Sequence, residues 1–193
     1  MTLLIAGVLL WSIVHLMKSV TPGLRGSIQS AIGEGPHRGL VAMLILTSVG
    51  LMIFGWRSVP AEFVYDPPNA GRHMNMLLMF VALYLIAIAQ GKSKMKQWVR
   101  HPMLTGVLVW CAGHLLANGD NKSLILFGGL GLWALISIIT ISRNEGAWVK
   151  PTEVAKPSRE VISILIVAVL YTVLFGAHRF IAGVALVGPN APA

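Results

Sequence analysis

Charged residues are scarce in this chain, and acidic residues are the scarcest of them. Only 11% of the 193 residues are charged, with 7 Asp and Glu against 15 Lys and Arg. Soluble proteins carry about 25% charged residues, so the composition excludes an ordinary soluble domain. Cysteine is nearly absent too. The single cysteine, Cys111, excludes an internal disulfide and carries no information on an oxidising compartment.

Apolar residues take the place of the missing charges. They make up 55% of the chain, and the mean hydropathy is +0.74. This balance indicates an integral membrane protein whose main partner is the lipid bilayer. A net charge of +8 can indicate nucleic-acid binding. Here the basic residues lie in short loops between apolar runs, so we interpret them as topology determinants and predict no nucleic-acid partner.

Six apolar stretches of roughly 15 to 20 residues divide the sequence, each near the length that crosses about 30 Å of hydrocarbon. No alternating pattern typical of a membrane β-barrel is present. The sequence predicts an all-α, polytopic membrane protein, a six-transmembrane-helix bundle that forms one domain over residues 1–193. The expected spans are Leu3 to Met17, Leu40 to Trp56, Met74 to Ala89, Met103 to Ala117, Leu124 to Ile141 and Ile162 to Ile181.

The loops predict the orientation, because Lys and Arg are retained on the cytoplasmic side. Basic residues gather after the first, third and fifth stretches, which places both termini on the periplasmic side of a bacterial inner membrane. The first stretch lacks a basic leader and an A-x-A-like cleavage site, so we expect it to be a retained span. The basic loops hold Lys18, Arg25 and Arg38, then Lys92, Lys94, Lys96 and Arg100, then Arg143, Lys150, Lys156 and Arg159, and the opposite loops hold Arg57, Arg72 and Lys122.

Cys111 and His114 are the candidate site residues that the sequence singles out first. They lie three residues apart within the fourth apolar stretch, on one side of the expected helix. An imidazole in hydrocarbon is costly without a partner, and such groups usually carry function. His114 is therefore either a metal ligand or a hydrogen-bonded core residue.

The other histidines lie nearer the ends of the stretches. His15 is either an interfacial residue or a ligand, and His101 either caps the start of the fourth stretch or serves as a ligand. His37 and His73 stand beside arginines, so we expect them to be solvated or to face lipid headgroups. His178 lies near the outer end of the last stretch, and its role stays open.

Haem suits this set of side chains better than zinc. Zinc prefers four ligands at short spacings, whereas haem needs one or two axial ligands and an apolar wall. Two histidines on different helices would hold the iron, with Arg25, Arg38 or Arg100 near the propionates. The predicted orientation puts His15 and His114 about 10 Å apart in depth, a gap that a tilted haem would bridge.

The segment QWVRHPMLTGVLVWCAGH, residues 97–114, joins an RHP motif to a WCxxH motif. Upstream lie IVH at residues 13–15 and GE-x-x-x-R at residues 33–38, and downstream lie NGD at residues 118–120 and AH at residues 177–178. This order resembles the NnrU family and its relative, the plant 15-cis-zeta-carotene isomerase family, over nearly the whole chain. His15 is followed by Leu16, where the isomerase has serine and glycine.

The resemblance implies a membrane protein that binds haem b. It implies His15 and His114 as the axial ligands and Cys111 as an alternative ligand. Arg25, Arg38 and Arg100, expected near the propionates, and His101 complete the candidate cofactor contacts. It also implies an association with denitrification proteins and nitric oxide metabolism, or cis–trans isomerisation of an apolar polyene. An isomerase of this type would be redox-gated, with Cys111 exchanging for His114 at the iron.

Two other functions stay open on the sequence. Arg100, His101, Pro102 and Gly106 resemble the isoprenylcysteine carboxyl methyltransferase group, which uses S-adenosylmethionine; that group adds an acidic and aromatic signature after the next helix, where Glu145 and Trp148 stand. The other alternative is a non-catalytic assembly partner of a nitric oxide reductase, in which the histidines only pack.

Overall fold

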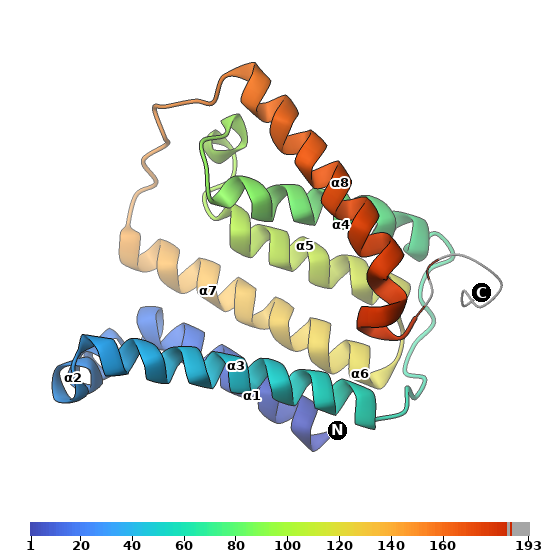
Figure 1. Cartoon of the computed structure of the whole chain (residues 1–193), viewed down its shortest axis with the longest axis horizontal. Coiled ribbons are helices and arrows are strands. Elements are labelled where there is room, and N and C mark those ends of the chain that lie inside the picture. The colour runs from blue at the N-terminus through green and yellow to red at the C-terminus, as the bar shows by residue number, and fades with distance from the viewer. Residues whose placement is uncertain (185, 187–193) are drawn as a thin grey trace.

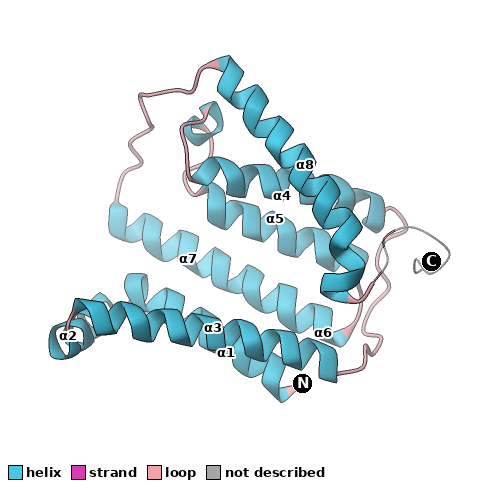
Figure 2. Ribbon diagram, in the orientation of Figure 1, coloured by secondary structure: helices cyan, strands magenta, loops and turns pink. Residues whose placement is uncertain are grey.

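The computed structural model describes residues 1–184 and residue 186, and it is built from helices. Figure 2 shows the helices joined by loops, with long extended connections over residues 59–70 and 146–156. Within the described residues, strand pairing is limited to one isolated bridge between Phe63 and Asp120. The helical segments are α1 (Thr2–Val20), α2 (Pro22–Ile32), α3 (Glu34–Ser58), α4 (Gly71–Ala89), the 3₁₀ helix η1 (Lys94–Gln97), α5 (Pro102–Ala117), α6 (Asn121–Ser123), the π-helix η2 (Leu124–Gly128), α7 (Gly129–Glu145) and α8 (Pro157–Ala182).

Within the part of the chain that the structure describes, five helical segments are long and apolar enough to cross a membrane: α1, α3, α4, the continuous segment Asn121–Glu145 and α8. The expected fourth span is α5, which has 16 residues. That length is about 24 Å of helix, short of the roughly 30 Å hydrocarbon layer. The all-helical membrane architecture is therefore confirmed, and the count of six spans is not. The N-terminus and the last turn of α8 lie at the same end of the bundle (Figure 1).

The bundle consists of two tight helix pairs with α7 between them. α1 packs along α3, and α4 packs along α5. α7 contacts α1 on one side and α5 on the other, while α8 lies across α4 (Figure 1). The pairs α1–α3 and α4–α5 are thus joined mainly through α7.

Glycines allow the close approach within each pair. A Cβ added at Gly55 of α3 would overlap the backbone of Leu4 on α1. A Cβ at Gly106 of α5 would lie 2.9 Å from the carbonyl oxygen of Ala82 on α4. Small residues at such contacts are the usual device for packing helices in membranes.

Apolar side chains cover the outside of the bundle as well as its inside. On α8, Val161, Leu165 and Val169 are 55%, 60% and 64% exposed. Large apolar side chains at these exposures suit contact with lipid, in which they need no protein partner. Pro157 begins this helix, where its missing N–H costs no hydrogen bond.

The structure corrects two expectations about the loop after the first span. Residues 22–32 form helix α2, where the sequence suggested only a turn and a basic loop. His37, expected to be solvated or to face headgroups, is buried at 3% exposure in the first turn of α3. Both differences lie in one segment, because α2 and α3 follow each other as two helices in contact instead of an open loop.

Candidate functional site

A cavity of about 610 Å³ surrounds His114, and we name it the His114 cavity. Its walls come from α3, α4, α5, the π-helix and α8, and apolar side chains dominate them. Arg57 and Arg72 lie among its lining residues. The lining also includes Met52, Ile53, Trp56, Asn75, Met76, Met79, Leu83, Trp110, Asn118, Leu126, Phe127, Tyr171, Leu174, Phe175 and His178.

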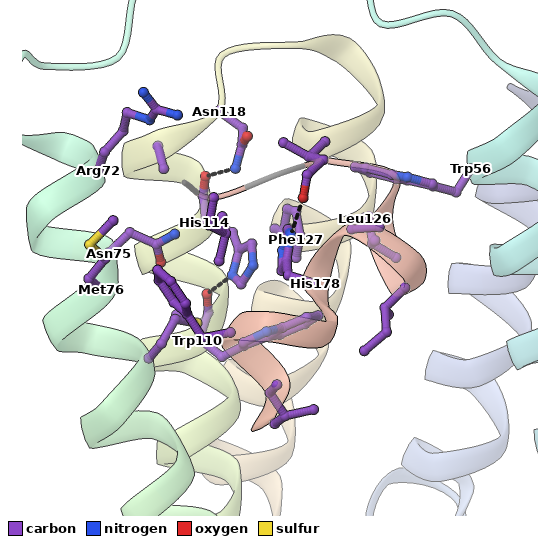
Figure 3. Close-up of a pocket in the computed structure, with 18 of the residues that line it drawn as sticks. Trp56, Arg72, Asn75, Met76, Trp110, His114, Asn118, Leu126, Phe127 and His178 are labelled. Atoms are coloured by element: carbon purple, nitrogen blue, oxygen red, sulfur yellow. Dashed lines mark hydrogen bonds between the residues drawn. The ribbon is translucent and has the colours of Figure 1, made fainter. Parts of the chain in front are cut away.

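The imidazole of His114 is held in one orientation. Its Nδ1 lies 2.9 Å from the carbonyl oxygen of Trp110, and its ring stacks on Phe127 with centroids 4.3 Å apart and planes 19° apart (Figure 3). A carbonyl oxygen only accepts, so Nδ1 carries the proton and Nε2 keeps a lone pair. A backbone carbonyl on one imidazole nitrogen is the usual support for a histidine that binds metal through the other nitrogen.

The π-helix η2 supplies the ring on which His114 stacks. It covers Leu124–Gly128, and both Leu126 and Phe127 line the His114 cavity. Phe127 also makes edge-on contacts with Trp110 and Trp56, at centroid distances of 4.8 and 6.2 Å. Single π-helical turns occur frequently at functional sites.

His178 is the second imidazole that lines the His114 cavity. It comes from α8, and its Nδ1 donates to the carbonyl oxygen of Val184 at 2.9 Å, which leaves its Nε2 with a lone pair. Figure 3 shows His114 and His178 on facing helices at this cavity. Two supported imidazoles therefore share one apolar space.

His15 lines a different cavity, of about 1370 Å³, which we name the His15 cavity. Its Nδ1 lies 2.8 Å from the carbonyl oxygen of Trp11, and its ring stacks on that indole at 4.1 Å. The ring of Trp133 contacts the His15 ring edge-on, with centroids 5.2 Å apart. The indole nitrogens of Trp11 and Trp133 are buried and have no hydrogen-bond partner in the described part of the chain.

The two cavities share three lining residues, Met52, Leu83 and Trp110. Both have α3 on one side and α4 on the other. They therefore meet near the middle of the bundle, and Trp110 of α5 stands between His15 and His114.

Arg100 and His101 line the His15 cavity at the start of α5. Arg100 forms an ion pair with Glu145 at 3.2 Å and donates to the carbonyl oxygen of Gly146 at 2.9 Å. The Nε2 atom of His101 lies 2.9 Å from the hydroxyl of Ser142. Partial burial lowers the pKa of His101, as does the nearby Arg100, while Glu145 acts in the opposite direction. The neutral imidazole is thus favoured in the fold.

His101 is expected to make the protein less stable in mild acid. An unfolded histidine takes up a proton near pH 6.5, whereas the folded His101 resists protonation to a lower pH. The neutral His101 contributes fully to the free energy of unfolding above about pH 6.5. This contribution is lost as the pH falls from there towards the pKa of His101 in the folded protein. Between about pH 7.5 and about pH 5, the Tm of wild type should fall more steeply than the Tm of His101→Gln. Equal slopes would contradict this.

The structure distributes the expected cofactor contacts over several places. His15, Arg100 and His101 line the His15 cavity, and His114 lines its own. The buried Cys111 lines neither, because it packs on Gly131 of α7 with its Cβ 3.3 Å from where a Cβ of that glycine would be. Arg25 of α2 and Arg38, which pairs with Glu34 at 2.6 Å, also line neither.

A model of the NnrU protein family matches residues 3–186. The chain belongs to the NnrU family. Neither a curated protein nor a solved structure matches it. The family model covers both cavities and every helix described above, so the two cavities are features of an NnrU domain.

The chemistry of the His114 cavity fits a haem. Among the described residues of this NnrU protein, no three His, Cys, Asp or Glu side chains gather as a possible metal group. Haem does not need such a group, since one or two axial imidazoles suffice. The cavity has two imidazoles with Nε2 lone pairs, apolar walls and the cations Arg57 and Arg72, and its lining also includes the carboxylate of Asp120.

Proposed function

We propose that this NnrU protein binds haem b in the His114 cavity, where His114 and His178 would hold the iron. The observation that carries the proposal is that both imidazoles line one cavity, each with its Nδ1 on a backbone carbonyl. A neutral histidine held in this way is a common metal ligand. The proposal keeps His114 from the resemblance and replaces His15 by His178, because His15 lines the other cavity.

The protein's own residues orient and shield the group. Trp110 and Asn118 fix His114 from its own helix, the first through a carbonyl at 2.9 Å and the second through a side-chain amide that donates to the carbonyl of His114 at 2.8 Å. Phe127 covers one face of its ring. Bound haem would supply one-electron chemistry. This fits a role in nitric oxide metabolism, while isomerisation of a polyene would use the apolar space where the cavities meet.

A spectrum of the purified protein tests haem binding. NnrU protein produced in haem-replete cells, or reconstituted with haemin in detergent, should give a Soret band and a reduced-minus-oxidised α band. Two axial imidazoles predict a low-spin spectrum. A protein that is folded by circular dichroism and shows neither band after reconstitution would refute the proposal.

Methyl transfer from S-adenosylmethionine is the second candidate, and one observation favours it. Arg100, at the RHP motif, pairs with Glu145, and both line the His15 cavity together with His101 and Trp148. The residues that resemble the methyltransferase group thus meet in one place. Titration calorimetry with S-adenosylmethionine should then show saturable binding that Glu145→Gln weakens. A wild-type protein that gives no heat at millimolar cofactor would exclude this function.

A further inference from the structure

The His15 cavity has a basic mouth. Lys18 at the end of α1, Lys96 in η1 and Arg100 before α5 all line it. The Arg100 charge is offset by Glu145, at 3.2 Å. Neither lysine forms an ion pair with a described residue, and the Nζ atom of Lys96 donates only to a neutral carbonyl, that of Ala89, at 2.7 Å. The mouth therefore keeps two uncompensated positive charges.

Behind this mouth the cavity becomes apolar. Val49, Leu83, Ile86, Leu104 and Val107 line it on α3, α4 and α5. This combination of a charged opening and an apolar interior within a membrane protein suits an amphipathic anion. A soluble anion would use the lysines and leave the apolar walls without a partner.

We propose that the His15 cavity binds an anionic phospholipid. Its phosphate lies between Lys18 and Lys96, and an acyl chain follows the apolar wall of α4 and α5. The mouth residues belong to the basic loops that are retained on the cytoplasmic side. Anionic lipids are abundant in that leaflet, and basic recesses between membrane helices bind their headgroups.

Native mass spectrometry of the full chain tests the proposal. Detergent-purified protein is incubated with phosphatidylglycerol or with phosphatidylcholine of the same acyl chains. Wild type should retain one phosphatidylglycerol in preference to phosphatidylcholine, and K18Q/K96Q should lower that retention by about 30-fold. The matched control is Lys122→Gln, because Lys122 lies at the other end of the bundle over Trp56, 4.6 Å from its ring.

Several outcomes would overturn the lipid site. They are equal retention of the two lipids, unchanged retention by K18Q/K96Q, and full displacement of the lipid by millimolar inorganic phosphate or by S-adenosylmethionine. Val107→Trp fills the apolar part of the cavity and should reduce retention while leaving the lysines intact. His114→Ala should leave lipid retention unchanged, which separates this site from the proposed haem site.

Discussion

Replacing His114 with alanine is expected to remove the haem bands from the purified NnrU protein. His114 supplies an Nε2 lone pair inside an apolar cavity, and alanine supplies no ligand there. Loss of a residue that merely supports a metal ligand costs about 10- to 100-fold in affinity. Loss of the ligand itself should cost more, and the variant should retain little haem after gel filtration. Absorbance per protein, with circular dichroism to confirm folding, measures the effect.

His178→Ala and His15→Ala decide which histidine is the second ligand. With His178 opposite His114, the first variant should turn a low-spin spectrum into a high-spin, five-coordinate one, and the second should leave the spectrum unchanged. His73→Ala is the matched control, because that histidine is exposed and lines neither cavity. A low-spin haem spectrum that is unchanged in His178→Ala and altered or lost in His15→Ala would favour the ligand pair that the resemblance implies.

The spans were predictable from the sequence because the lipid environment requires long apolar helices. Five of the six expected stretches correspond to helices that meet this requirement, and their ends extend beyond the apolar core of each stretch. α5 is the exception, since Pro102 starts it and Asn118 ends it after 16 residues. α2 was missed because glycine and serine, weak helix formers, take up four of its 11 residues.

The candidate site was less predictable because helix rotation and depth are not visible in a motif. Cys111 and His114 share one side of α5, but a spacing of three residues still turns the second side chain by about 60° from the first. That rotation is enough for Cys111 to pack on α7 while His114 lines the cavity. The ligand exchange between them is therefore not supported by the geometry.

His178 could have been chosen as a candidate ligand from its expected depth in the membrane. The basic loops predict that the fourth stretch and the last stretch end on the same side of the membrane, and His114 and His178 lie near those ends. His15 is predicted to lie near the other side. This is the depth difference of about 10 Å between His15 and His114, the two ligands that the resemblance implies. The sequence could not show that α8 crosses α4 so that His178 lines the cavity of His114.

Gly55→Ala is expected to destabilise the bundle strongly for a change of one methyl group. The added Cβ would overlap the backbone nitrogen and Cα of Leu4, and backbone atoms of a packed helix cannot rotate away as a side chain can. Overpacking of this kind typically costs about 1 to 3 kcal/mol. At about 2 to 4 °C per kcal/mol for a chain of this size, the Tm in detergent should fall by several degrees.

Gly50→Ala on the same helix is the matched control, because no atom lies within 4 Å of the Cβ that it would add. Alanine favours a helix over glycine by about 1 kcal/mol, so this variant should melt at or above the wild-type temperature. Since α1 carries Trp11 and His15 while α3 carries Met52 and Trp56, separating the pair should also weaken ligand binding in both cavities. If Gly55→Ala had the same Tm as Gly50→Ala, the close contact between α1 and α3 would not be what holds these two helices together.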